Sequence, residues 1–344
     1  MQAAYLTGHG GNEVVAIGER PKPQRRPGEV LVRMHAATLN RVDLYMRDSG
    51  AGITHALPQI MGVDGAGVVE EVDDDDPLLE PGMRVLLYPG VTCGRCEFCA
   101  RGEGVLCTSM KLLGEHRDGT LAEYVVLPAA NALPFPDTLD FAQAAALGVN
   151  HLTAWRMLVT KARLQPWETV LIFGIGGGVS LAGLQIAKMI GSRAIVTSRD
   201  DAKLERALQM GADDVVNGTR DDVAKRVLAL TGGRGVDVVL ENVGASVWPA
   251  ALKSVVRGGR VVTCGATSGD QPGADLRRVF IRQLQIFGST LGDLREFREL
   301  LGVCERGLLV PQIESRWPLA QLHAALDRLD AGEQFGKIAI EIGG

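Results

Sequence analysis

No apolar run in this sequence approaches the roughly 18 consecutive residues that a membrane-spanning helix requires. The first ten residues, MQAAYLTGHG, lack the basic region and apolar core of a secretory signal peptide. The net charge of −5 gives no reason to expect nucleic acid or an anionic membrane as a partner. We therefore expect a cytoplasmic protein that binds neither nucleic acid nor membranes.

Cysteine is also scarce, yet four of the six cysteines lie between positions 93 and 107, in CGRCEFCARGEGVLC. In a reducing compartment this clustering indicates a metal before disulfides. Four thiolates suit tetrahedral zinc and leave no open position, so we predict one structural Zn2+. An iron–sulfur cluster is the alternative, but the closer fourth cysteine and the proline of ferredoxins are absent. The predicted ligands are Cys93, Cys96, Cys99 and Cys107.

The 344 residues are enough for two domains with separate cores. The first part of the chain, up to residue 149, is β-rich, with period-two alternation around Val30, Val32 and Met34. Residues 150–287 alternate apolar runs with helix-compatible segments, which predicts a doubly wound parallel sheet. The predicted strands are 170–173, 194–197, 214–216, 236–240, 260–264 and 284–287, and a helix is predicted at about 201–210.

A glycine-rich turn follows the first of these strands and precedes a helix-compatible segment. This order is typical of a dinucleotide site, because glycine lets the backbone approach a pyrophosphate and the helix N-terminus offers unpaired N–H groups. In the preferred register, Gly177 is the central glycine and Ser180 takes the third glycine position. The predicted cofactor-binding residues of this turn are Gly174, Gly176, Gly177, Gly178, Val179 and Ser180.

The segment TSRDD, residues 197–201, follows the second predicted strand, where cofactor choice is made. Ser198 and Arg199 offer a hydroxyl and a guanidinium that suit a 2′-phosphate, which favours NADP(H). Asp200 and Asp201 argue for NAD(H) if they reach the ribose, although a helix N-cap explains them equally well. Further cofactor contacts are predicted after later strands, at Val243, Gly265 and Ser289.

The β-rich first part, the four cysteines, DGTLAEYVV (118–126), the glycine turn and a final FGKIAIEI occur in this order. The whole sequence resembles the medium-chain dehydrogenase/reductase superfamily, which contains zinc alcohol dehydrogenases and zinc-free quinone oxidoreductases. The resemblance implies a GroES-like catalytic domain (1–149 and 288–344) with a zinc lobe, a Rossmann domain (150–287), and a homodimer or homotetramer. Gly336 and Lys337 match a common ending of the family, and a surface charge is the alternative interpretation of Lys337.

The resemblance also implies a catalytic zinc held by two cysteines and a histidine, but these ligands are missing. Asn40, Val63 and Val149 stand in their places, and neither an amide nor an aliphatic side chain replaces thiolate or imidazole on zinc. We therefore predict only the structural zinc. Ligation by Asp43, Asp64 or His151 is the alternative, and structural roles for these carboxylates are preferred.

Asn40, Asp43 and Tyr45 form an N-x-x-D-x-Y pattern that resembles the zinc-free quinone and enone reductases. In that resemblance Asn40 lies near the nicotinamide, Tyr45 lies near the substrate, and Arg41 contacts the cofactor pyrophosphate. Asn40 and Tyr45, together with Asn150 or His151, would orient the substrate carbonyl or return a proton to it.

The resulting prediction is NADP(H)-dependent reduction of a quinone or conjugated enone, since such substrates are electrophilic without a Lewis acid. One alternative is an NAD(P)-dependent alcohol or aldehyde dehydrogenase with an atypical zinc site. A second alternative is a non-catalytic NADP(H)-binding sensor or scaffold.

Overall fold

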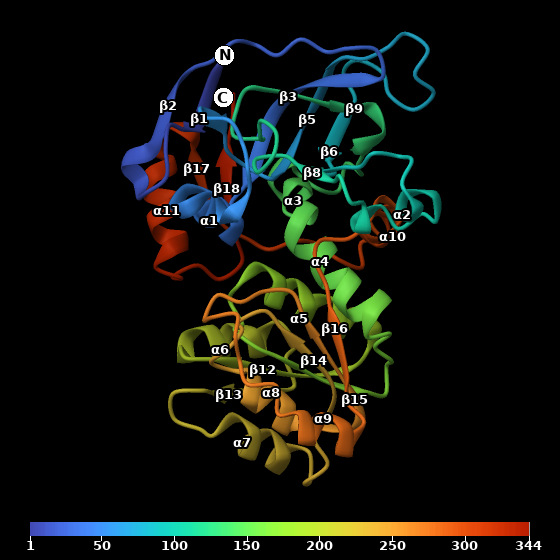
Figure 1. Ribbon diagram of the computed structural model, residues 1–344, viewed down its shortest axis with the longest axis vertical. Coiled ribbons are helices and arrows are strands. Elements are labelled where there is room, and N and C mark those ends of the chain that lie inside the picture. Colours follow the sequence, from blue (N-terminus) through green and yellow to red (C-terminus); the bar gives the residue numbers. More distant parts are fainter. Residues whose placement is uncertain (344) are drawn as a thin grey trace. The chain divides into compact units, whose positions relative to one another are not determined.

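The computed structural model describes residues 1–343, which form two compact units whose elements are labelled in Figure 1. The first unit contains Met1–Asn150 and the residues from Asp293 onward, and the second contains His151–Gly292. In the part of the chain that the structure describes, no helix is both long and apolar enough to cross a membrane.

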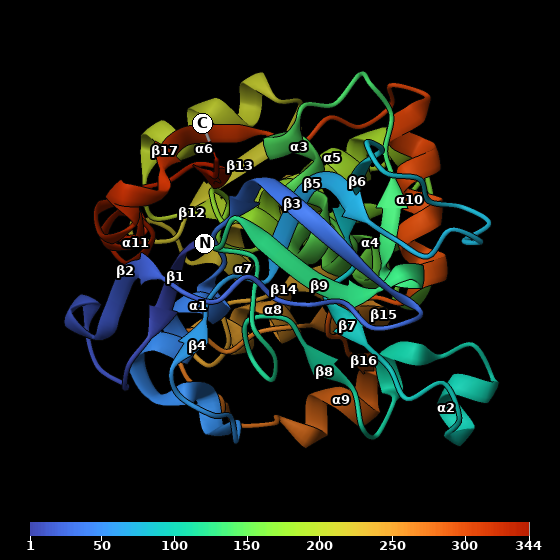
Figure 2. The same ribbon diagram turned by 90° about the horizontal axis from the view of Figure 1, so that it is seen from above.

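The first unit is organised around β3 (Glu29–Thr38), which pairs antiparallel with three other strands. Figure 2 shows two of these partners, β5 and β9, beside β3. These are β5 (Asp64–Glu71), β9 (Tyr124–Pro128) and β18 (Lys337–Glu341). The sheet has the order β10-β6-β5-β3-β18-β17, and it is completed by β6 (Arg84–Leu87), β10 (Ala132–Pro134) and β17 (Ile313–Pro318). Pairing of β18 with β3 brings Lys337 close to the end of β3, although the two are about 300 residues apart in sequence.

Smaller elements surround this sheet. A three-stranded sheet has the order β2-β1-β4, and β7 pairs with β8 beside the four-cysteine segment. Their bounds are β1 (Gln2–Leu6), β2 (Val15–Glu19), β4 (Gln59–Ile60), β7 (Gly90–Val91) and β8 (Lys111–Leu112). The helices of the unit are α1 (Arg41–Ser49), α2 (Glu97–Ala100), α3 (Phe141–Ala145), α10 (Leu294–Glu305) and α11 (Leu322–Asp330).

The second unit is a six-stranded parallel sheet with the order β13-β12-β11-β14-β15-β16. Its strands are β11 (Thr169–Ile172), β12 (Arg193–Ser198), β13 (Asp214–Asn217), β14 (Val236–Glu241), β15 (Val255–Thr263) and β16 (Gln285–Gly288). The helices are α4 (Leu152–Trp155), α5 (Gly178–Ile190), α6 (Asp201–Gln209), α7 (Val223–Leu230), α8 (Trp248–Ser254) and α9 (Leu276–Arg282). The central strand β11 is almost entirely apolar, as expected of a strand buried on both faces, whereas β14 also buries the carboxyl groups of Asp237 and Glu241.

The predicted α/β fold class is confirmed: a β-rich unit and a unit with a Rossmann-type parallel sheet are both present. All predicted strands of the second unit are found, and β15 differs most, since it begins at Val255 instead of 260. A register shift opposite β14 interrupts its pairing, and Gly258 with a φ of 72° lies within the interruption. The first part of β15 was not predicted, because Arg257, Gly258 and Gly259 interrupt its apolar residues.

Candidate active site

Asn40 lies at the junction between β3 and α1, where it is the N-cap residue of the helix. Its backbone N–H donates to Asp43 Oδ2 at 2.7 Å, and both residues are buried. A carboxylate three residues into a helix commonly satisfies the N-cap N–H in this way. The Asn40-x-x-Asp43 spacing therefore has a structural role in fixing the start of α1.

A buried ion pair lies beside Asn40. Lys337 Nζ is 3.0 Å from Asp64 Oδ2, and the two side chains are 3% and 0% exposed. Asp64 Oδ2 also accepts hydrogen bonds from Thr38 Oγ1 at 2.8 Å and from Asn40 Nδ2 at 2.9 Å. The interpretation of Lys337 as a surface charge is wrong, because pairing of β18 with β3 buries it in this cluster.

The Asn40 amide uses all of its hydrogen-bonding capacity within the cluster. Its Oδ1 accepts from Lys337 Nζ at 2.7 Å and from Asn150 Nδ2 at 2.6 Å. Its Nδ2 donates to Asp64 Oδ2 and to the Thr38 carbonyl oxygen at 3.3 Å. Asn150 keeps a second N–H and an Oδ1 that bond to none of the described residues. The structure thus brings Asn40, Asp43 and Asn150 together, and Asn150 retains a donor for a ligand.

The donor set of this cluster does not suit zinc. Amides and an ammonium group occupy it, and an ammonium group cannot ligate a metal. Among the described residues, side chains with metal-ligating spacing are found only in the four-cysteine segment. His151 belongs to the second unit, where its Nε2 lies 3.1 Å from Gln185 Oε1.

Two buried carboxyl groups near this cluster have pKa values above their usual range. Burial raises the pKa of Asp43 to about 7; the Asn40 N–H and Lys337 oppose this shift, whereas the charges of Asp64 and Glu115 add to it. Burial also raises the pKa of Glu115 to about 7. The Glu115 carboxyl is nearly buried and makes no hydrogen bond or ion pair with the described residues. Sequence analysis missed Glu115, because no local pattern reveals that its carboxyl is buried.

Tyr45 and Arg41 lie on α1 and are partly exposed. Burial raises the pKa of Tyr45, with a smaller opposing effect of Arg41, so the hydroxyl is protonated at neutral pH. That hydroxyl bonds to none of the described residues. Arg41 Nη1 lies 3.5 Å from Asp330 Oδ1, and both side chains are exposed, so the pair is weak and the guanidinium is available to another anion.

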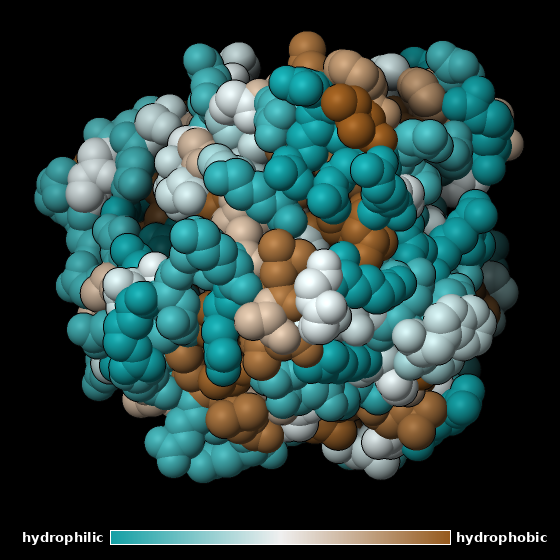
Figure 3. Space-filling model, turned by 90° about the horizontal axis from the view of Figure 1, so that it is seen from below, coloured by the Kyte–Doolittle hydropathy of each residue, from teal (hydrophilic) through white to brown (hydrophobic). Residues whose placement is uncertain are grey.

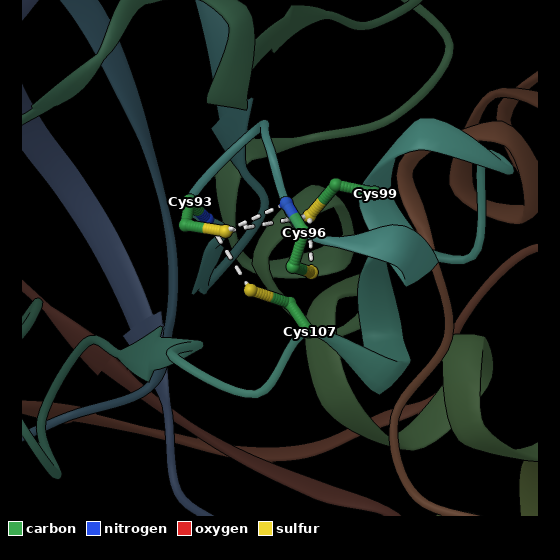
Figure 4. Close-up of side chains that lie close together, drawn as sticks. All are labelled: Cys93, Cys96, Cys99 and Cys107. Atoms are coloured by element: carbon green, nitrogen blue, oxygen red, sulfur yellow. Dashed lines mark hydrogen bonds between the residues drawn. The ribbon is translucent and has the colours of Figure 1, made fainter.

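The four cysteines converge in a lobe formed by the segment after β7, α2 and the turn before Cys107 (Figure 4). Their sulfur atoms all lie within 4.8 Å of one another. Tetrahedral zinc with Zn–S bonds of about 2.3 Å requires sulfur–sulfur distances of about 3.8 Å. Backbone N–H groups already point at sulfur, from Cys96 to Cys93 at 3.4 Å and from Cys93 to Cys107 at 3.3 Å. The residues therefore fit a structural Zn2+.

Replacing Cys96 by serine is expected to lower the zinc content from about one ion per chain to near zero, since the tetrahedral ligand set is incomplete. The thermal midpoint should fall as the lobe loosens. Cys264→Ser, outside the lobe, is the control and should keep its zinc. Elemental analysis of protein purified without added metal or chelator measures this. About two zinc ions per wild-type chain would contradict the assignment of a single site.

The glycine-rich turn connects β11 to α5, and its backbone requires glycine. Gly174 and Gly176 have φ values of 69° and 111°, in the region that side chains disfavour. Gly177 is the N-cap of α5 and offers no side-chain cap, so the first N–H groups of the helix, from Gly178 and Val179, are left for an anion.

Ser180 is fully buried, and its hydroxyl donates to the Phe173 carbonyl oxygen at 2.7 Å, as expected of a small residue at the strand–helix contact. Gly183, one turn later, gives the closest approach: a β-carbon there would lie 2.6 Å from Leu240 Cδ1. Close packing of α5 on the sheet thus depends on Ser180 and Gly183 together.

Later strand ends contribute polar groups that lack partners. Glu241 is buried and its carboxylate accepts from the Val243 and Gly244 N–H groups, which fixes the turn after β14. Asn242 Oδ1 and Ser289 Oγ are buried and have no hydrogen-bond partner among the described residues. Gly265 allows a close approach to this turn, because a β-carbon there would lie 2.8 Å from the Asn242 carbonyl oxygen. Asn242 Oδ1 lies beside the glycine turn, since a β-carbon at Gly174 would be 3.8 Å from it, and an unpartnered buried acceptor there fits a bound dinucleotide.

The two aspartates after β12 are already engaged. Asp200 is the N-cap of α6 and accepts from the Ala202 N–H at 2.8 Å. Asp201 pairs with Arg220 at 2.7 Å and accepts from Asn217 Nδ2 at 2.8 Å; Asn217 and Arg220 both lower the pKa of Asp201. By contrast, Arg199 is exposed and bonds to none of the described residues. Ser198 Oγ accepts only from the Asp200 N–H, at 3.1 Å, and can still donate.

Comparisons with known proteins agree with this architecture. Two family models match, described as an alcohol dehydrogenase GroES-like domain (residues 26–137) and a zinc-binding dehydrogenase (residues 178–306). An alcohol dehydrogenase of Geobacillus stearothermophilus is 33% identical over 330 residues, which cover 95% of this chain and 96% of that protein. The solved structure of an NAD-dependent alcohol dehydrogenase is 41% identical, with a TM-score of 0.96 and full coverage of both chains. A cobalt- and zinc-bound thermostable alcohol dehydrogenase from Pyrobaculum aerophilum is 31% identical, with a TM-score of 0.90 over 99% of each chain.

Proposed function

The chain belongs to the medium-chain dehydrogenase/reductase superfamily and is an oxidoreductase; from this premise we propose that it reduces a quinone or a conjugated enone with NADP(H) by direct hydride transfer, using a single structural zinc. The observation that supports this substrate class is the donor set around Asn40, which takes the place of a zinc ligand and is hydrogen-bonded to Asn150 and Lys337. A saturated alcohol needs a Lewis acid to lower the pKa of its hydroxyl, whereas a quinone or enone is already electrophilic.

In the proposed mechanism the bound cofactor supplies the hydride, and side chains of the chain manage the oxygen and the proton. The unused N–H of Asn150 donates to the substrate carbonyl, where negative charge develops. The Tyr45 hydroxyl, which stays protonated at neutral pH, returns the proton. The N-terminus of α5 would hold the pyrophosphate of the cofactor. The exposed Arg41 guanidinium is proposed as a cofactor contact from the family resemblance alone.

The test is turnover by purified protein with NADPH and a panel of quinones and enones, after chelation mild enough to leave the fold intact. We expect oxidation of NADPH with at least one electrophile and no dependence on added zinc. Asn150→Ala should reduce kcat about 100-fold, because a donor to a developing oxyanion is lost. Activity that disappears on metal removal and returns with zinc would contradict the proposal.

NADP(H) is proposed over NAD(H) because Ser198 and Arg199 are available after β12 while Asp200 and Asp201 are occupied. Arg199→Ala is expected to weaken NADPH binding about tenfold or more and to leave NADH binding nearly unchanged, since only NADPH carries the 2′-phosphate. Fluorescence titration with both cofactors measures this, with Arg226→Ala on α7 as the control. Equal loss for both cofactors would show that Arg199 does not read the phosphate. The NAD dependence named for one similar structure belongs to that protein.

Alcohol or aldehyde oxidoreduction through an atypical zinc site is the second candidate, because the similar proteins are named alcohol dehydrogenases. It requires a second, exchangeable zinc bound by Asp43, Asp64 or His151. Two zinc ions per chain, together with alcohol turnover, would favour it over quinone or enone reduction.

We also propose that the chain forms a homo-oligomer through the edge of the parallel sheet. β16 pairs only with β15, so its other edge is open among the described residues. Leu276, Phe280 and Ile281 on α9 and Ile286 on β16 are exposed apolar side chains near this edge. Brown apolar patches also interrupt the mainly hydrophilic face that carries α7 and α9 (Figure 3). An open edge with exposed apolar residues is a typical site of pairing between chains.

A further inference from the structure

We propose that Lys337 is the positioning residue of this site: its buried ammonium group fixes the orientation of the Asn40–Asn150 amide pair and thereby holds the remaining Asn150 N–H in place for a substrate. The inference rests on the proposed carbonyl reduction and names the group that organises it. Lys337 does not touch the substrate in this scheme; it acts through the two amides.

The ammonium group is held at three points. Lys337 Nζ donates to the Leu39 carbonyl oxygen at 2.8 Å, to Asn40 Oδ1 at 2.7 Å and to Asp64 Oδ2 at 3.0 Å. An ammonium group has three donors, so all of them are used. Since Lys337 is also the first residue of β18, next to β3, both ends of its side chain are fixed. The charge therefore has one position in the folded protein.

This fixed donor determines how the amides point. Reversal of the Asn40 amide would place its NH2 group against the ammonium donors of Lys337 and the NH2 group of Asn150, while its oxygen would face the Asp64 carboxylate. Every one of these contacts would be donor to donor or acceptor to acceptor. Lys337 and Asp64 thus force Asn40 Oδ1 toward Asn150, and Asn150 must turn its NH2 group toward Asn40. The second N–H of that group is the one left for a substrate.

The same arrangement fixes the Asn150 donor before any reaction begins. Lys337 Nζ and Asn150 Nδ2 both donate to Asn40 Oδ1, so the position of that one acceptor decides where the Asn150 donor is held. Preorganised donors stabilise a developing oxyanion without reorganising during the reaction. Lys337 thus contributes to the site by holding this donor in place, without binding the substrate.

A pair of variants separates this role from a structural one. Asp64→Asn removes the carboxylate that pairs with the buried Lys337 ammonium, whereas Asp64→Asn/Lys337→Met removes both charges of the pair; Asp43 is kept in both variants. The double variant is expected to have the higher thermal midpoint, because an unpaired buried charge is removed. It is nevertheless expected to have at least tenfold lower kcat than Asp64→Asn. A structural role for Lys337 predicts the same order for stability and activity, so equal or higher kcat in the double variant would overturn the proposal.

A measurement that needs no turnover distinguishes failure of this inference from failure of the proposed function. In protein labelled with 15N at asparagine, the side-chain NH2 signals of Asn40 and Asn150, assigned by Asn40→Ala and Asn150→Ala, report their hydrogen bonds directly. Exchange of the Asn150 amide protons with water should be at least tenfold faster in Asp64→Asn/Lys337→Met than in Asp64→Asn. Unchanged exchange would overturn the positioning role whether or not an enone is reduced.

Discussion

Asp64→Leu is expected to lower the free energy of unfolding by about 3–5 kcal/mol, because it leaves the buried Lys337 ammonium without its carboxylate partner. The two side chains are 3% and 0% exposed, so water cannot solvate the remaining charge without opening the structure. The Thr38 hydroxyl and the Asn40 amide lose an acceptor in the same substitution. Each unmet hydrogen-bonding group adds to the loss.

Denaturant unfolding of three variants tests this explanation. Thr38→Val, which removes one hydrogen bond to Asp64 and keeps the charges, should cost only about 1 kcal/mol. Asp64→Leu/Lys337→Met removes both charges and should recover much of the stability lost by Asp64→Leu, since apolar replacements of a buried pair are often tolerated. A double variant no more stable than Asp64→Leu would show that the loss arises from poor packing and not from the unpaired ammonium group.

The fold could be predicted because its signals are local and occur in a specific order. Short apolar strands, the glycines at 174–178 and a C-x2-C-x2-C-x7-C spacing are each visible within a few residues of sequence. The convergence of the four cysteines followed for the same reason: short intervals can wrap only a compact lobe around an ion.

The site was harder to predict because its groups are distant in sequence. Lys337 reaches Asn40 only through the pairing of β18 with β3, a separation of 297 residues. Glu115 could not be identified either, since its burial depends on the tertiary structure and not on its neighbours in sequence. The missing zinc ligands could be recognised in the sequence at Asn40 and Val63, but the burial of Lys337 beside Asn40 could not.

Asp200 illustrates a different limit. Its position fits both a ribose ligand and a helix N-cap, and sequence alone leaves the choice open. In the structure its carboxylate accepts from the Ala202 N–H, so the capping role is realised.

Glu115→Gln is expected to raise the free energy of unfolding at pH 8 by up to about 3 kcal/mol, with little effect near pH 4. Burial raises the pKa of Glu115 to about 7 in the folded protein, whereas the unfolded chain releases this proton near pH 4.5. Between these values the folded state binds more protons than the unfolded state, so the free energy of unfolding falls as pH rises. Glutamine cannot ionise, and the variant therefore escapes this loss.

Urea unfolding at intervals between pH 4 and pH 8 measures the effect as a difference in slope against wild type. Glu205→Gln, on the exposed face of α6, is the matched control and should leave the slope unchanged.

Asp43 contributes a slope of the same sign, because burial raises its pKa to about 7 and the charge of Glu115 adds to that shift. Removing the Glu115 charge should therefore also lower the pKa of Asp43, so Glu115→Gln and Asp43→Asn should gain less together than the sum of their separate effects. Strict additivity would mean that the two carboxyl groups titrate independently, and an unchanged slope in Glu115→Gln would mean that its carboxyl is solvated in the folded protein.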